Sequence, residues 1–411
     1  MSSGESSQSQ WAVFRHRPYL IYWLARSLTS FAVQIQVVAL GWQVYALTEN
    51  PLDLGLIGLS QFAPALLLVL VTGAVADRLP RRAIMITTLL VSAAVSASLL
   101  VFTLLDSHIV WLVFALLVVF GTARAFRGPA VQALLPNIVP PELLSRAIAL
   151  NSSAWQLTII VGPVAGGLLY GVSPLAPYIA ATSLLVLGAI LATFIPKPEQ
   201  HRESEPRSWD TVLAGFKYIW REKIVLGAIS LDLFAVLLGG ATALLPVYAS
   251  DILSVGPVGL GLLRAAPGIG AIAVAIFLAT HPVRDHAGLF LFFFVALFGA
   301  MILVFGASTI TWLSIAALAV AGGADMISVY IRETLIQLWT PDRLRGRVNA
   351  VNMLFVGASN ELGEFRAGVL AFFIGAKATV ALGGAGTLMV AGIWAKLFPD
   401  LRKARHLDGR P

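Results

Sequence analysis

The chain has 411 residues, of which 58% are hydrophobic and only 12% are charged, and its net charge is +7. Soluble domains carry about 25% charged residues, so this chain lacks the charge needed to cover a protein of its size in water. The composition excludes a soluble enzyme, a disordered scaffold and a nucleic-acid-binding module. It predicts an integral membrane protein.

Apolar stretches recur along the whole chain, and a helix needs about 20 apolar residues to span the hydrocarbon. Windows of about 19 residues predict twelve spans. The predicted spans are 19–47, 52–76, 83–105, 110–135, 145–170, 175–195, 224–249, 257–280, 287–306, 310–338, 348–374 and 378–398. We therefore expect an all-α membrane protein with twelve transmembrane helices.

Arginine and lysine residues concentrate in alternate loops. Arg78, Arg81 and Arg82 follow the second predicted span, and Arg402 and Lys403 follow the last. The opposite set of loops is acidic, with a single lysine. Cytoplasmic loops carry the excess of basic residues, so both termini are expected in the cytoplasm.

One long polar stretch, 196–223, separates two predicted six-helix bundles at 1–195 and 224–411. In its second part, Val212 and Phe216 share a face, which predicts an amphipathic helix on the cytoplasmic surface. A plain solvated connector is the alternative.

The two halves resemble each other at an offset of 201 residues. The matched pairs include Trp111 with Trp312, Arg124 with Asp325, Arg146 with Arg347, Asn151 with Asn352, and Gly162 with Gly363. Because six spans is an even number, both halves enter the membrane from the same side. This pattern indicates a parallel repeat, with a cavity between the halves near the middle of the membrane.

Three segments resemble the major facilitator superfamily. The first, between spans 2 and 3, resembles the family signature and consists of Gly73, Asp77, Arg78, Arg81 and Arg82. The resemblance implies a conformational latch in which Asp77 faces the N-terminal end of span 11. In the alternative interpretation, these charges only set the topology.

The second segment, Gly121 to Ala130, resembles the family's span-4 pattern, in which an embedded arginine (Arg124 here) assists proton coupling. The third is similar to the glycine-proline motif of the family's antiporters and consists of Gly162, Pro163, Gly166 and Gly167. Glycine and proline also serve helix packing in membranes, so a purely structural role is the alternative.

Within the superfamily, the chain resembles the branch of enterobactin exporters and drug:proton antiporters. The stretches that carry this resemblance are the latch, 213–219 and 340–349. It implies a monomeric, proton-coupled exporter of the bacterial inner membrane that moves a siderophore or an aromatic or hydrophobic compound by alternating access. The alternatives are a proton-linked uptake symporter, and a non-transporting sensor or lipid-handling protein.

Charged residues within spans are the candidates for proton coupling: Arg124, Asp232, Asp325, Glu361 and Glu364. Asp325 is the repeat partner of Arg124, which suggests a pair across the cavity. Glu361 and Glu364 are three residues apart and so share a helix face, where each raises the proton affinity of the other. The alternative is a static ion-pair network with Arg264 or Arg332.

Polar and aromatic residues within spans are the candidates for the substrate cavity: Arg26, Gln34, Gln36, Gln61, Trp155, Gln156, Asn352 and Asn360. Amides in lipid need partners, which favours inward-facing positions, although each one alone is also explained by a hydrogen bond between helices. The chain has no cysteine and six scattered histidines, so we expect no metal site. We also expect no enzymatic activity and no cofactor, since no nucleophile with a partner and no phosphate-binding loop is evident.

Overall fold

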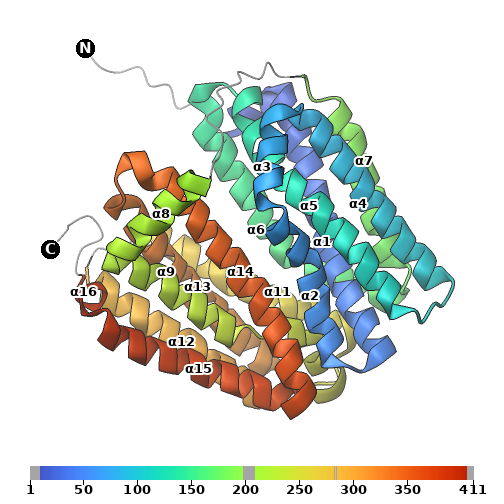
Figure 1. Ribbon diagram of the computed structural model, residues 1–411. Coiled ribbons are helices and arrows are strands. Elements are labelled where there is room, and N and C mark those ends of the chain that lie inside the picture. The colour runs from blue at the N-terminus through green and yellow to red at the C-terminus, as the bar shows by residue number, and fades with distance from the viewer. Residues whose placement is uncertain (1–9, 198–208, 282, 284, 405–411) are drawn as a thin grey trace. The chain divides into compact units, whose positions relative to one another are not determined.

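The computed structural model describes residues 10–197, 209–281, 283 and 285–404, and within these ranges the chain forms helices and no strand (Figure 1). In this part of the chain, ten helices are long and apolar enough to cross a membrane. The shorter α2 and the more polar α14 bring the count to the expected twelve spans. The all-α membrane fold is confirmed.

The elements of the first half are η1 (Gln10–Arg15), α1 (Arg17–Thr48), α2 (Pro51–Leu67), α3 (Val69–Arg78), α4 (Arg81–Leu104), α5 (Val110–Ile138), α6 (Pro141–Val172) and α7 (Ala176–Thr193). The elements of the second half are α8 (Trp209–Arg221), α9 (Lys223–Gly239), η2 (Thr242–Leu244), α10 (Leu245–Val247), η3 (Tyr248–Ile252), α11 (Gly256–Thr280), α12 (Ala287–Ala307), α13 (Thr311–Trp339), α14 (Asp342–Ile374), α15 (Ala376–Leu397) and α16 (Pro399–Lys403).

Two predicted spans are not single continuous helices. The second is divided into α2 and α3 at Leu68, one turn after Pro64, whose ring and missing N–H weaken the preceding turn. The seventh was predicted to run over 224–249, but α9 ends at Gly239. The consecutive glycines at 239 and 240 lower the helix propensity there, and a short π-helix follows at η3.

The chain divides into two compact units, which differ from the two halves of the sequence. Unit 1 comprises 1–36, 63–162 and 175–206, and unit 2 comprises 37–62, 163–174 and 207–411. Helices α1, α2 and α6 therefore contribute one segment to each unit.

The core of unit 1 forms where α4 packs against α5 and α7. Its buried hydroxyl groups are satisfied locally: Ser92 donates to the carbonyl of Thr88 at 2.8 Å, one turn earlier in α4. Thr182 of α7 donates to the hydroxyl of Ser96 at 3.0 Å and so joins α7 to α4. Such pairing is required because the hydrocarbon offers no water to these groups.

Small residues allow the helices of unit 2 to approach closely. A side chain at Gly299 of α12 would stand 3.0 Å from the carbonyl oxygen of Gly384 of α15. Thr387 of α15 donates to the carbonyl of Ala235 of α9 at 3.0 Å. Contacts of this kind are the usual source of helix association in membranes.

The expected amphipathic helix is present as α8, which packs against α9 and α14 (Figure 1). Tyr218 donates to the carbonyl of Trp339 at 2.8 Å, and Phe216 makes an edge contact with Phe355. Ile219 is buried, whereas Trp220 is exposed. The side chain of Val212 and most of the linker before α8 lie outside the described residues.

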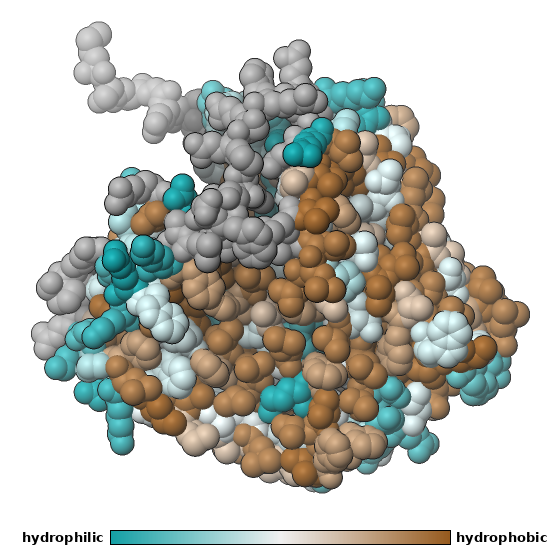
Figure 2. All heavy atoms as spheres, in the orientation of Figure 1, coloured by the Kyte–Doolittle hydropathy of each residue, from teal (hydrophilic) through white to brown (hydrophobic). Residues whose placement is uncertain are grey.

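Large apolar side chains cover the surface of the molecule, and Figure 2 shows them over most of the visible face. Examples are Trp111, Leu289 and Phe373, each more than half exposed. Soluble monomers rarely expose apolar patches of this extent, so these faces are suited to contact lipid.

Candidate transport site

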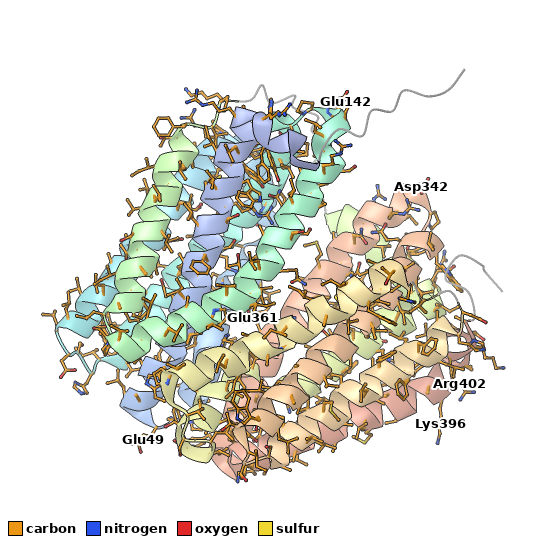
Figure 3. All side chains as sticks on the ribbon, turned by 180° about the vertical axis from the view of Figure 1, so that it is seen from behind. Glu49, Glu142, Asp342, Glu361, Lys396 and Arg402 are labelled. Carbon is orange, nitrogen blue, oxygen red and sulfur yellow. The ribbon has the colours of Figure 1, made fainter. Side chains whose placement is uncertain are left out.

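Two carboxylates meet in unit 2 at a glycine of α2. A side chain on Gly58 would stand 3.2 Å from Oε2 of Glu361 and 3.3 Å from Oε2 of Glu364. Both glutamates belong to α14, and they point to the same side of it, in agreement with their spacing. Figure 3 shows Glu361 midway along α14, well away from Asp342 at the start of that helix. Because glycine has no side chain, α2 leaves room for both carboxylates.

Arg264 of α11 completes this group, since it interacts electrostatically with both Glu361 and Glu364. All three side chains are half-buried. We call Arg264, Glu361 and Glu364 the carboxylate cluster. The cluster therefore brings one guanidinium and two carboxylates together from α11 and α14.

A separate ion pair lies deeper in unit 2. Asp232 of α9 and Arg332 of α13 contact each other and are 8% and 3% exposed. The next residue, Glu333, accepts a hydrogen bond of 2.7 Å from the amide of Asn352 in α14. Asp232 was predicted to couple protons and Asn352 to line the cavity. The structure places both in contacts that join α9, α13 and α14.

Asp325 lies within α13, is half-buried, and makes no hydrogen bond or ion pair with any other described residue. A carboxylate at this depth is costly and is usually functional. Its repeat partner Arg124 is exposed on α5, and the neighbouring Arg127 repels it electrostatically. Asp325 and Arg124 belong to different units, so their pairing stays a prediction.

Unit 1 contains a small polar cavity of about 10 Å³ between α1 and α6. It is lined by Arg26, Ser27, Ser30, Asn151, Ala154, Trp155 and Thr158. Arg26 and Trp155 were among the predicted cavity residues, whereas the serines, Asn151 and Thr158 were not. The spacing of Asn151, Trp155 and Thr158 along α6 is that of one helix face, and this signal identifies them in retrospect.

Two hydrogen bonds orient the arginine of this cavity. Arg26 donates from Nη1 to the hydroxyl of Tyr22 at 3.3 Å, and Tyr22 donates in turn to the carbonyl of Val131 at 3.1 Å. Asn151 is only 5% exposed, and neither its Oδ1 nor its Nδ2 has a hydrogen-bond partner among the residues that the structure describes.

The other predicted cavity residues are more dispersed. Gln34 packs tightly against Gly162, and Gln36 is buried with Oε1 unpartnered. Gln61 and Asn360 each donate to a carbonyl one turn earlier in their own helix, at 3.5 and 2.8 Å. Gln156 is half-buried on α6.

The glycine-proline motif of α6 forms a close backbone contact with α11. A side chain on Gly261 would stand 2.5 Å from the carbonyl oxygen of Pro163, and one on Gly167 would collide with the carbonyl of Pro257. Gly166 is buried beside them. The boundary between the two units on α6 falls between Gly162 and Pro163.

The basic residues of the predicted latch bind helix ends in unit 1. Arg81 donates from Nη1 to the carbonyl of Ala133 at 2.9 Å and to Oδ1 of Asn137 at 2.6 Å, in the last turns of α5. Arg82 donates to the carbonyl of Thr193 at the end of α7. Cations stabilise helix C-termini in this way.

Of the remaining latch residues, Gly73 is buried and Arg78 is exposed. The side chain of Asp77 lies outside the described part of the chain. Among the described residues there is also no group of three or more histidine, cysteine, aspartate or glutamate residues placed to hold a metal ion.

Curated relatives match this chain over nearly its whole length. The "Enterobactin exporter EntS" of Escherichia coli O1:K1 is 24% identical over 404 residues, which cover 95% of this chain and 94% of the relative. The protein of the same name from Citrobacter koseri is 24% identical over 413 residues, covering 96% of each chain.

Solved transporters share the fold. A nucleoside transporter, NupG, matches with a TM-score of 0.72 at 13% identity, covering 93% of this chain and 99% of that one. A bacterial homologue of the human lysosomal transporter Spinster matches at 0.74 and 14% identity, covering 95% and 99%. A bacterial homologue of the iron transporter ferroportin matches at 0.67 and 17%, covering 92% and 98%.

The model of one family, described as transmembrane secretion effectors, matches residues 8–411. Together with the helical fold and the embedded charges, this match means that the chain is a multi-pass membrane transporter and not an enzyme. It belongs to the transmembrane secretion effector family of the major facilitator superfamily.

Proposed function

We propose that this transporter exports a small organic molecule across the bacterial inner membrane in exchange for protons. The observation that carries the proposal is the carboxylate cluster, in which Glu361 and Glu364 face Gly58 and both interact with the cation Arg264. A proton that binds one carboxylate weakens the attraction of that carboxylate for Arg264. The bound proton thereby changes how strongly α11 and α14 are held together.

The positions of these groups suit a conformational cycle. Gly58 lies in the 37–62 segment and the carboxylate cluster in 207–411, so unit 2 itself contains a contact between segments from both halves of the sequence. A proton-dependent change at α14 therefore acts on α2 at Gly58. Asp325, which has no partner among the described residues, is a second candidate for proton binding.

Export as the direction is supported by the relatives, which are named exporters, and by the glycine-proline motif of α6. We also propose that both termini lie in the cytoplasm, which the distribution of arginine supports. The substrate we propose is a siderophore or a related aromatic compound, with hydrophobic drugs next. We further propose that the transporter acts as a monomer with six-helix bundles at 1–195 and 224–411.

The test is proton flux in everted membrane vesicles, followed with a pH-sensitive dye while candidate aromatic compounds are added. The wild type should dissipate the pH gradient with at least one compound. Glu361→Gln and Glu364→Gln, made singly and together, should abolish this response, and Asp325→Asn should reduce it. Asp342→Asn is the matched control, since this carboxylate also belongs to α14 but its side chain is 90% exposed.

The role of the carboxylate cluster, the direction of transport and proton coupling can each fail separately. Gradient dissipation that persists in the double glutamine variant would refute the role of the carboxylate cluster. Uptake of a compound into intact cells, driven by an inward proton gradient, would show import instead of export. If substrate exchange occurs with no proton movement in the wild type, coupling itself is absent.

A further inference from the structure

The polar cavity of unit 1 plays no part in the proton cycle proposed above, yet it has the features of a ligand site. We call Arg26, Ser30, Asn151 and Trp155 the Arg26 pocket. Its volume of about 10 Å³ is that of one water molecule, so it admits a single oxygen atom of a ligand. The remainder of such a ligand must lie outside this cavity.

The groups that face the cavity are arranged to donate hydrogen bonds. Arg26 has five N–H groups, and within the described part of the chain it uses one of them, in a hydrogen bond to Tyr22. Asn151 is 5% exposed, and no described residue forms a hydrogen bond with its Nδ2 or Oδ1. A buried amide without partners costs free energy, and a ligand oxygen that accepts from Nδ2 removes part of this cost.

The charge around the pocket favours an anion. Arg26 lines the pocket and makes no ion pair with any described residue. An arginine within a membrane span is costly and is retained when it faces a partner or a water-filled cavity. A neutral ligand oxygen would leave this cost in place, whereas a carboxylate or phenolate would offset it.

The same pocket carries an aromatic surface. Trp155 borders the cavity and is 45% exposed, although indole is among the side chains that gain most from burial. A flat ring attached to the anionic oxygen can stack on this indole.

We propose that the Arg26 pocket binds a carboxylate or phenolate oxygen carried by an aromatic ring, so that the transported compound is an aromatic anion. This inference rests on the proposed function for its direction of transport, but binding itself needs no proton gradient.

The experiment measures binding to the purified full-length protein in lipid nanodiscs by titration calorimetry at neutral pH. The probes are 2-naphthoate, its neutral analogue 2-naphthamide, and the non-aromatic acid decalin-2-carboxylate. We expect 2-naphthoate to bind the wild type at least about 10-fold more tightly than 2-naphthamide, as for a hydrogen bond to a charged group. This ratio requires no variant, so it stands even where a substitution disturbs folding.

Variants then locate the site. Arg26→Gln should remove the preference for the acid, and Arg26→Lys should retain most of it. Asn151→Leu should weaken the binding of 2-naphthoate about 10-fold. Trp155→Leu should abolish the preference for 2-naphthoate over decalin-2-carboxylate. Arg17→Gln is the control, because Arg17 is an exposed arginine at the start of the same helix.

The proposal is overturned if the wild type binds the amide as tightly as the acid, if 2-naphthoate does not bind, or if Arg26→Gln keeps the preference. These outcomes are independent of proton coupling. Tight binding of 2-naphthoate by the double glutamine variant at Glu361 and Glu364, together with its loss of proton flux, supports both proposals as separate functions. Binding that is normal while the wild type moves no protons overturns only the coupling.

Discussion

Units 1 and 2 contain repeated helices, yet residue 131 of α5 and its repeat position, residue 332 of α13, make different contacts. In unit 1, α1 meets α5 where Tyr22 donates to the carbonyl of Val131 at 3.1 Å. In unit 2, α9 meets α13 where Asp232 pairs with Arg332, which aligns with Val131 in the repeat. The ionic contact gives unit 2 a buried charge pair that unit 1 does not have at this position.

A second repeated pair shows the same difference. Asn352 of unit 2 donates to Glu333 at 2.7 Å, whereas for its equivalent in unit 1, Asn151, neither amide atom has a partner in the described ranges. At this repeated position, unit 2 therefore satisfies the amide nitrogen internally, whereas unit 1 leaves the amide next to Arg26 without a partner among the described residues. Under the two proposals above, unit 1 recognises the substrate and unit 2 handles the proton.

Breaking the ion pair of unit 2 should give the largest effect. Asp232→Asn removes the contacting carboxylate of the buried Arg332 and leaves it only Glu333, at 4.0 Å, so we expect a loss of about 3 kcal/mol in the free energy of unfolding, measured by thermal or denaturant unfolding in detergent. The double variant Asp232→Leu with Arg332→Met should recover most of this loss. Arg127→Met in unit 1 should be nearly neutral, since Arg127 has no ion-pair partner within the described part of the chain. Equal losses in the two units would contradict the comparison.

Placing a branched side chain at Gly167 should give the second-largest effect. Because Gly167 packs against the backbone at Pro257, Gly167→Val requires a shift of α6 or α11, and we expect a loss of about 1–3 kcal/mol in stability. Transport should fall with it. Gly128→Val is the matched control, because no atom lies within 4 Å of a side chain there. If the two variants unfold at the same temperature, the α6–α11 contact adjusts freely to the larger side chain.

Placing a carboxylate in the Arg26 pocket should give Arg26 a counter-charge, as Asp232 does for Arg332 in unit 2. Ser30→Asp supplies Arg26 with a fixed counter-charge and should weaken binding of 2-naphthoate at least about 10-fold, equivalent to about 1.4 kcal/mol, without loss of stability. The uncharged variant Ser30→Asn separates charge from size. Calorimetry on the two variants checks this, and similar affinities for both would argue against an anion site.

The smallest expected effect concerns a hydrogen bond within unit 2. Tyr45 of α1 donates to the carboxylate of Asp251 in η3. Tyr45→Phe removes this donor, and because Asp251 is exposed we expect a loss of only about 1 kcal/mol. A double-mutant cycle with Asp251→Asn measures the coupling; additive effects would mean that the bond contributes nothing.

Much of the fold could be predicted from the sequence, because long apolar stretches and the distribution of basic residues are local signals. The division of the second span at Leu68 and the end of α9 at Gly239 were missed, although Pro64 and the paired glycines are visible in the sequence. Their effect depends on whether neighbouring helices compensate for the weakened turn, which only the packed structure shows.

For the site, the shared face of Glu361 and Glu364 follows from helix geometry and was predicted correctly. The choice between Arg264 and Arg332 was open, since it depends on how distant helices pack. The structure places Arg264 opposite the glutamates and Arg332 against Asp232. Asn151 was noted only as a repeat position, because nothing in a sequence shows whether a buried amide has a partner.

The division of α1, α2 and α6 between the two units has a consequence for gene fragments. A polypeptide that begins at Arg207 lacks the 37–62 and 163–174 segments, so Gly261 and Gly368 would lose the backbones that cover them at Pro163 and Gly55. The repeat in the sequence is a half of the chain, but that half does not coincide with either compact unit. A split version of this transporter should therefore require both pieces to be synthesised together.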